Sequence, residues 1–193
     1  GVDVVLESQK KTSLNQTLDY INTNFAEFIF GYNDEQPYQI LGEKLEAKGL
    51  TIAVAESCTG GLIGHALTNR SGSSQYFEGG VIAYSNQVKI EMLAVKTETI
   101  KKYGAVSRET ALEMAQGVRD KLGVDVGLST TGIAGPTGGS REKPVGTVWI
   151  AIAAGEKQAA RRYVFNKNRI QNKLAFKKFA LINTIKFLDG RLS

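Results

Sequence analysis

The sequence has only one cysteine and one histidine among its 193 residues. A single cysteine excludes an internal disulfide and a zinc site built on several cysteines, and a single histidine argues against a metal cage built on histidines. The chain also lacks a run of about 18 apolar residues, which a membrane-spanning helix would need, and it lacks a signal-peptide pattern. We therefore expect a cytoplasmic protein with no metal site and no membrane contact.

The chain also lacks a large excess of charge of one sign. It has 24 Lys and Arg residues and 19 Asp and Glu residues, which gives a net charge of +5. Basic runs such as Arg161-Arg162 are not interleaved with aromatic residues, so nothing argues for nucleic-acid binding. A mild positive charge suits a phosphorylated small molecule as well as a nucleic acid, and is most often a solvated surface. With 42% hydrophobic residues, the chain is apolar enough for one domain with a buried core.

From about residue 38 the predicted strands and helices alternate along the chain. Helices are expected between the strands, with one ending at Gly49, one beginning at Ser107 and the longest at 170–188. A turn at 154–156 pairs the last two strands as neighbours. This order predicts an α/β fold with helices on both faces of a mixed sheet. Apolar runs predict its strands at 50–55, 77–84, 124–130, 145–153 and 161–165.

Residues 1–36 differ from the rest of the chain. Apolar residues recur at helical spacing from Leu14 to Phe28, and 28–32 has the composition of a short strand. Because a turn follows at 33–37, we divide the chain into an N-terminal extension, 1–36, and a domain, 37–193. The extension is too small for a core of its own, and its apolar residues favour a homo-oligomer such as a dimer.

The seven residues from Ala55 to Gly61 include two hydroxyls, a thiol, a carboxylate and two glycines. They follow the strand at 50–55 and precede a helix expected from Leu62. A strand, a turn and a helix that meet at Ser57 aim backbone N–H groups and the positive end of a helix dipole at one small space, which suits an anion. The same residue types also cap helices, so the local pattern alone does not separate a reactive site from a structural turn.

A second glycine-rich turn, Thr131-Gly132-Ile133-Ala134-Gly135-Pro136, follows the strand at 124–130. Ligands of open α/β sheets bind beyond the carboxyl ends of the strands. The two turns should lie at that edge of the sheet, so we expect a single pocket between them.

Ser57 is a candidate nucleophile, and a serine nucleophile needs a base. His65 lies eight residues further along the chain, in a helix that leads away from Ser57, so we interpret it as a surface or packing residue and not as a triad member. A desolvated lysine loses its proton more easily than an exposed one. Lys89 follows the strand at 77–84 and is the candidate base, and Tyr84 could orient the lysine or the substrate.

Cys58 is a rival nucleophile, which Glu56 could serve as a base. Because strand residues alternate in direction, only one of Ser57 and Cys58 should face the pocket, and the periodicity does not say which. Structural interpretations stay open for each group: Cys58 as a small buried hydrophobe, Lys89 as a surface lysine and Tyr84 as a packing residue.

Five motifs occur together, in order, between about Tyr38 and Leu188. They resemble the C-terminal domain of the CinA (competence/damage-inducible) family, the nicotinamide-nucleotide amidase domain also called PncC. The resemblance implies a three-layer α/β/α sandwich around a five-stranded mixed sheet. The motifs are Ala55-Glu56-Ser57-Cys58-Thr59-Gly60-Gly61, Tyr84-Ser85-Asn86-x-x-Lys89, Gly104-Ala105-Val106-Ser107, Thr131-Gly132-Ile133-Ala134-Gly135-Pro136 and Lys143-Pro144-Val145-Gly146-Thr147.

The resemblance also implies an activity, the hydrolysis of the carboxamide of nicotinamide mononucleotide to nicotinic acid mononucleotide and ammonia, without a cofactor. It carries a catalytic Ser/Lys pair onto Ser57 and Lys89, with Tyr84 close by. It thereby selects the serine over Cys58. Substrate contacts are then expected from the two turns and from a basic residue that matches a further functional position: Glu56, Thr59, Gly60, Gly61, Thr131, Gly132, Gly135 and Arg169.

A non-catalytic function is the alternative. Family members usually carry Gly-Asp-Arg where this chain reads Lys167-Asn168-Arg169. The second hypothesis is therefore a module that binds a pyridine nucleotide without turnover, or that docks a partner in a competence or damage response.

The resemblance extends to the start of the chain. Residues 1–36 are similar to the region that connects this domain to a preceding one in longer CinA proteins, and the sequence opens with Gly1-Val2-Asp3. We therefore expect the chain to be a fragment of a longer protein.

Overall fold

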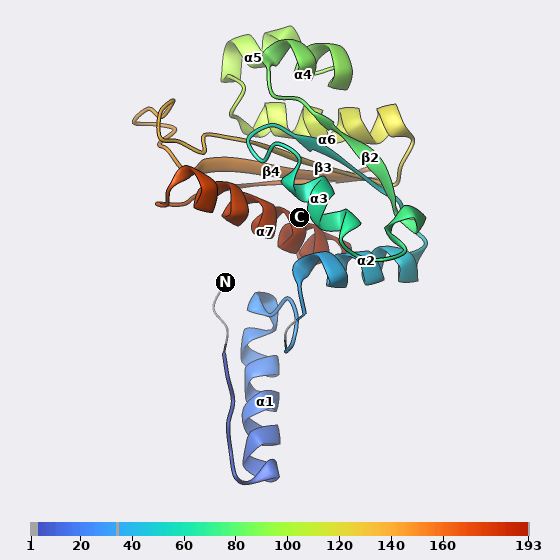
Figure 1. Cartoon of the computed structure of the whole chain (residues 1–193), viewed down its shortest axis with the longest axis vertical. Coiled ribbons are helices and arrows are strands. Elements are labelled where there is room, and N and C mark those ends of the chain that lie inside the picture. Colours follow the sequence, from blue (N-terminus) through green and yellow to red (C-terminus); the bar gives the residue numbers. More distant parts are fainter. Residues whose placement is uncertain (1–3, 34, 193) are drawn as a thin grey trace.

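A five-stranded mixed sheet forms the centre of the protein (Figure 1). The computed structural model describes residues 4–33 and 35–192, so the predicted chain start at 1–3 and residue 34 of the predicted turn lie outside the described residues. The spatial order of the strands is β2-β1-β3-β4-β5. Their bounds are β1 (Ile52–Glu56), β2 (Phe77–Ile82), β3 (Val126–Gly132), β4 (Thr147–Ala154) and β5 (Lys157–Val164).

Strand direction places the two glycine-rich turns together. β1 is parallel to both β2 and β3, whereas β4 is antiparallel to β3 and to β5. Glu56 at the end of β1 pairs with Thr130 near the end of β3. The turns that follow these two strands therefore begin side by side at one edge of the sheet.

Helices cover both faces of the sheet (Figure 1). One layer holds α2 (Pro37–Lys48), α3 (Leu62–Thr68) and α7 (Arg169–Leu188), and the other holds α4 (Asn86–Leu93), α5 (Thr97–Tyr103) and α6 (Arg108–Leu122). A short 3-10 helix, η2 (Ser73–Gln75), precedes β2. The predicted α/β/α sandwich with a five-stranded mixed sheet is confirmed.

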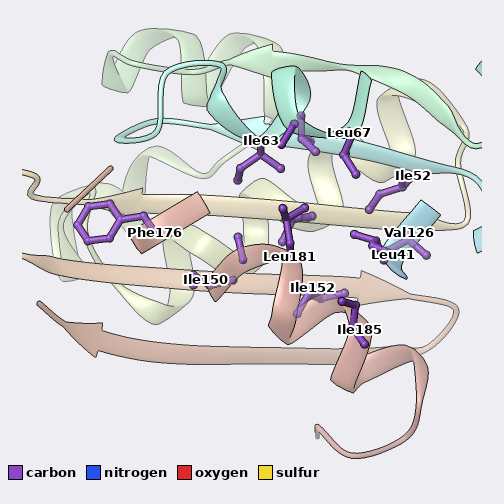
Figure 2. Close-up of a cluster of buried hydrophobic side chains, with 14 of the residues drawn as sticks. Leu41, Ile52, Ile63, Leu67, Val126, Ile150, Ile152, Phe176, Leu181 and Ile185 are labelled. Atoms are coloured by element: carbon purple, nitrogen blue, oxygen red, sulfur yellow. The ribbon is translucent and has the colours of Figure 1, made fainter. Parts of the chain in front are cut away.

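The side chains of β1 point alternately to the two faces of the sheet, and an apolar cluster lies on each face. Ile52 and Val54 belong to the cluster shared with α2, α3 and α7, and Ala53 and Ala55 to the cluster on the opposite face. Burial of one large apolar side chain stabilises the fold by about 1.5–3 kcal/mol. The first cluster therefore fixes α3 and α7 on the sheet, and Figure 2 shows its helix residues, among them Leu41, Ile63, Leu67, Phe176, Leu181 and Ile185.

Small residues let α6 approach the opposite face closely. A Cβ atom on Gly127 in β3 would lie 2.0 Å from the carbonyl oxygen of Ala115 in α6, a distance that side chains do not tolerate. Only glycine fits there unless the helix moves. The close approach also brings the loop that precedes α6, residues 104–107, over the end of β3.

Capping residues fix where the helices begin and end. Gly49 ends α2 in the left-handed conformation, with φ of 62°. Ser85, Ser107 and Asn168 begin α4, α6 and α7, and the side chain of each accepts the backbone N–H three residues on. The predictions for Gly49 and Ser107 are confirmed, and the starts of three helices that border the site are set locally.

The N-terminal extension departs from its prediction. Its helix, α1 (Lys11–Phe25), buries no residue and stands away from the sheet in Figure 1. The predicted strand at 28–32 is wrong, because Ala26–Phe28 forms a 3-10 helix, η1, and 29–32 has no strand. A strand needs a neighbour to pair its N–H and C=O groups, and the described sheet holds only β1 to β5.

β5 begins at Lys157, four residues before the predicted 161, because it pairs with β4 from the turn onward. None of the helices formed by residues 4–33 and 35–192 combines the length and the apolar character that a membrane crossing requires.

Candidate active site

A cavity of about 180 Å³ lies between the two glycine-rich turns. Ser57 follows β1, and its N–H donates a hydrogen bond of 3.0 Å to the carbonyl of Thr130 in β3. The predicted pocket at the carboxyl ends of the parallel strands is thus present. Residues from both turns, from α4 and the segment before it, from α7 and from the loop before α6 line it: Ser57, Cys58, Tyr84, Asn86, Lys89, Ala105, Val106, Thr131, Gly132, Ala134 and Arg169.

The cavity brings the predicted Ser57 and Lys89 together. Lys89 Nζ, from the first turn of α4, lies 3.1 Å from Ser57 Oγ. The same Nζ donates hydrogen bonds to the carbonyls of Ala83, at 2.7 Å, and of Tyr84, at 3.1 Å. Only 1% of Lys89 is exposed. A buried amine at this distance from a hydroxyl is placed to exchange a proton with it.

Burial also changes the acidity of this amine. Loss of solvation lowers the pKa of Lys89 from its ordinary value of 10.5 to about 8. Its hydrogen-bond partners are one hydroxyl and two carbonyl oxygens, and all three are uncharged. A neutral amine, which is the form that accepts a proton, is therefore accessible near neutral pH.

Cys58 also lines the cavity, which corrects one expectation. The prediction that only one of Ser57 and Cys58 faces the pocket is wrong, because β1 ends at Glu56 and both residues lie in the turn, where strand alternation no longer applies. Burial raises the pKa of the Cys58 thiol to about 12. Since the thiolate is the nucleophilic form, this thiol is a poor nucleophile near neutral pH, whereas the Ser57 hydroxyl lies 3.1 Å from the Lys89 amine.

Glu56 does not line the cavity. Its buried carboxylate accepts hydrogen bonds from the N–H groups of Gly61 at 2.9 Å, Ile63 at 3.1 Å and Gly64 at 2.8 Å. These donors belong to the start of α3, where N–H groups have no partner within the helix. Glu56 therefore anchors α3 from the end of β1, and the turn that carries Ser57 is held between them.

Replacement of Glu56 by alanine is expected to lower the free energy of unfolding by about 2–4 kcal/mol, because buried N–H groups lose a charged acceptor. Urea denaturation followed by circular dichroism measures this loss. Glu98→Ala is the matched control, since Glu98 is also acidic and lies in the first turn of a helix but is exposed, and we expect a change below about 0.5 kcal/mol. Equal losses in the two variants would contradict the anchoring role.

Arg169 and Tyr84 meet at the exposed rim of the cavity. Arg169 Nη1 donates a hydrogen bond of 2.6 Å to the carbonyl of Gly135, and Nη2 donates one of 3.4 Å to the hydroxyl of Tyr84. Tyr84 is 65% exposed. A guanidinium is always charged and pairs well with phosphate or carboxylate oxygens, so this side of the cavity suits an anionic group.

The second turn supplies wall residues. Thr131 and Gly132 both line the cavity, and Thr131 Oγ1 donates a hydrogen bond of 2.7 Å to the carbonyl of Ala105. This bond ties the end of β3 to the loop before α6. Thr131 therefore holds the two walls together.

Three predicted residues of the glycine-rich turn after β1 lie outside the cavity wall. Thr59 is fully buried, and its Oγ1 lies 2.7 Å from the Oγ1 of Thr130. Gly60 and Gly61 have φ of 62° and 95° and form the turn into α3. These three residues shape the turn that presents Ser57.

Sequence reasoning missed four wall residues, Asn86, Ala105, Val106 and Ala134. Each lies inside a motif that was already singled out, so membership of a motif was the available signal. His65, by contrast, is exposed on α3 as predicted. Among residues 4–33 and 35–192, no group of three or more His, Cys, Asp or Glu side chains is arranged to hold a metal ion.

Known proteins resemble both the sequence and the fold. Residues 34–188 match the family described as the CinA C-terminal domain. A CinA-like protein from Salinibacter ruber is 47% identical over 176 residues, which is 89% of this chain and 43% of that protein. A putative competence-damage inducible protein from Halothermothrix orenii is 52% identical over 143 residues, 74% of this chain and 35% of that protein. The chain thus spans less than half the length of these curated relatives.

Solved structures agree with this assignment. The competence/damage inducible protein CihA from Agrobacterium tumefaciens superposes with a TM-score of 0.74 at 38% identity, over 82% of this chain and 99% of that one. A CinA superfamily protein from Klebsiella pneumoniae gives a TM-score of 0.77 at 28% identity, over 81% and 99% of the two chains. The match covers most of the sequence and the whole cavity, and the chain belongs to the CinA C-terminal domain family.

Proposed function

We propose that this protein is an amidohydrolase that converts nicotinamide mononucleotide to nicotinic acid mononucleotide and ammonia. One observation carries the proposal: the buried amine of Lys89 lies 3.1 Å from the hydroxyl of Ser57 in the cavity wall. A carboxamide needs an activated nucleophile. Arg169 in the same wall offers a cation for a phosphate, so the two ends of the substrate have matching groups.

The contacts of Lys89 orient its lone pair. A neutral amine has two N–H groups and one lone pair. The carbonyls of Ala83 and Tyr84 take the two N–H groups, which leaves the lone pair for the hydroxyl proton of Ser57. After that proton transfer the ammonium has three N–H groups, and the third points back to Ser57 Oγ. The site thus accommodates both protonation states without a change of rotamer.

The reaction that follows is acyl transfer. Ser57 Oγ attacks the carboxamide carbon while Lys89 takes the hydroxyl proton, and the resulting ammonium gives this proton to the departing nitrogen as ammonia leaves. Water then attacks the ester on Ser57 while Lys89 takes a proton from it. The resulting ammonium returns this proton to Ser57 Oγ as the ester bond breaks and the carboxylic acid is released. The N–H of Ser57 is bonded to Thr130, so we assign the oxyanion to the N–H groups of the turn that follows it.

Incubation of the protein with nicotinamide mononucleotide tests the proposal. Released ammonia is measured with a coupled assay, and nicotinic acid mononucleotide is identified by chromatography. Stoichiometric formation of both supports the amidase. Tight calorimetric binding without turnover would favour the alternative, a non-catalytic module that binds a pyridine nucleotide, and overturn the amidase.

The pH dependence of kcat/KM is expected to follow the deprotonation of Lys89. Because burial lowers the pKa of Lys89 to about 8, the neutral base becomes the major form above that pH. We expect kcat/KM to rise tenfold per pH unit below about 7 and to level off above about 9. A profile between pH 5.5 and 10 measures this, and a flat profile across pH 8 would contradict the assignment of Lys89 as the base.

A further inference from the structure

Asn172 is a buried amide in the first turn of α7, next to the cavity but not in its wall. It is fully buried, and its N–H donates to the carbonyl of Asn168 at 2.8 Å. Its side-chain Nδ2 donates two further hydrogen bonds, to the carbonyl of Ala134 at 3.0 Å and to the carbonyl of Lys167 at 2.8 Å. One side chain therefore joins the turn after β3 to the loop before α7.

These two segments are the ones that set the position of Arg169. Arg169 follows the loop that contains Lys167, and its Nη1 donates to the carbonyl of Gly135, the residue after Ala134. If the two segments separate, the guanidinium loses either its backbone position or its acceptor. The amide of Asn172 bridges them on the buried side, and Arg169 bridges them at the rim.

Stability alone does not explain an asparagine at this position. The Oδ1 atom of Asn172 is buried without a hydrogen-bond partner in the described part of the chain. A buried unsatisfied acceptor costs about 1–3 kcal/mol, and this cost offsets much of the stability that the two donated hydrogen bonds contribute. What the amide provides is a fixed distance between two loops.

We propose that Asn172 is a positioning residue that holds Arg169 against Gly135 and thereby sets the affinity for the anionic end of the substrate. This inference rests on the proposed function, because it assigns Arg169 to a phosphate. Asn172 does not touch the reacting atoms, so its effect falls on binding and not on the chemical step. A nucleoside that lacks the phosphate should not depend on Asn172.

The test compares N172L and N172A with the matched variant N183L. Asn183 is also a buried amide of α7, with its Oδ1 bonded to the hydroxyl of Tyr163 at 2.9 Å, but it lies three turns further from the cavity. We expect N172L and N172A to raise KM for nicotinamide mononucleotide about tenfold or more and to change kcat less than about threefold. N183L should leave both constants unchanged, and N172A serves where N172L does not fold.

Two further readouts separate positioning from a loss of structure. With nicotinamide riboside, which has no phosphate, N172L should match the wild type. With the mononucleotide, R169A and the double variant R169A/N172L should have the same KM, because Asn172 acts through Arg169. Three results would overturn the inference. The KM increases of R169A and N172L could add in the double variant, N172L could weaken activity equally with both substrates, or N172L could leave KM for the mononucleotide unchanged.

Failure of the inference is distinct from failure of the proposed function. An active wild type with an unaffected N172L overturns the inference alone. If the wild type releases no ammonia but binds the mononucleotide in calorimetry, the amidase proposal fails, and a tenfold weaker Kd in N172L still supports the positioning role. A wild type that neither binds nor hydrolyses the mononucleotide overturns both.

Discussion

Ser57→Ala is expected to abolish ammonia release from nicotinamide mononucleotide, with kcat falling about 10⁴-fold or more. In the proposed mechanism the hydroxyl oxygen forms the covalent bond, and it is the cavity-wall hydroxyl that Lys89 Nζ contacts, at 3.1 Å; the other two hydrogen bonds of this amine go to carbonyls. The substrate should still bind, because Arg169 and Thr131 are untouched. Calorimetry of S57A should therefore still detect binding of nicotinamide mononucleotide.

Cys58→Ala is the matched control for this result. Cys58 is adjacent to Ser57 and lines the same cavity, but its thiol is protonated at neutral pH because burial raises its pKa to about 12. We expect C58A to retain kcat within about threefold. If S57A stays active and C58A is inactive, the nucleophile is the cysteine and the Ser/Lys mechanism is wrong.

Much of the fold could be predicted because its determinants are local. The alternation of apolar runs placed all five strands, and residues such as Gly49 and Ser107 marked helix boundaries that the structure confirms. The strand predicted at 28–32 failed for a non-local reason. Its composition suits a strand, but a strand also needs a partner, and the described sheet offers none beside it.

The candidate site shows where sequence reasoning stopped. The two strand-ending turns predicted a pocket, but the choice of Lys89 among 24 basic residues depended on a family resemblance, since nothing in the local pattern reveals that its side chain turns inward. Glu56 shows the opposite problem. A carboxylate next to a candidate nucleophile suggested chemistry, whereas the structure bonds it to the N-terminus of α3.

Replacement of Lys89 by methionine is expected to lower kcat/KM by about 10²–10⁴-fold, the range of a general base. Methionine keeps the length and most of the volume of the side chain but has no lone pair for the hydroxyl proton of Ser57. The rise of kcat/KM through pH 8 should disappear with the base. Ammonia release by K89M, measured between pH 6 and 10, tests both statements.

The lowered pKa of Lys89 also predicts how the free energy of unfolding changes with pH, and this prediction does not depend on turnover. The unfolded chain holds this proton up to pH 10.5, whereas the folded protein releases it at about pH 8, so between these values the unfolded state binds more protons. Stability contributed by this group therefore increases as pH rises from 8 to 10.5. The free energy of unfolding of the wild type, relative to K89M, should rise across this window by up to about 3 kcal/mol.

A lysine outside the cavity is the control for the activity assay and for the unfolding measurement. Lys44 in α2 bonds to Asp189 at 2.7 Å and is partly exposed, so K44M should keep the wild-type kcat/KM and its rise through pH 8. Loss of activity in K89M, together with a wild-type free energy of unfolding that rises relative to K89M between pH 8 and 10.5, would support a buried Lys89 of lowered pKa that acts as the base. Retention of activity in K89M, or a relative stability that does not change between pH 8 and 10.5, would contradict the role of this amine as the base beside Ser57.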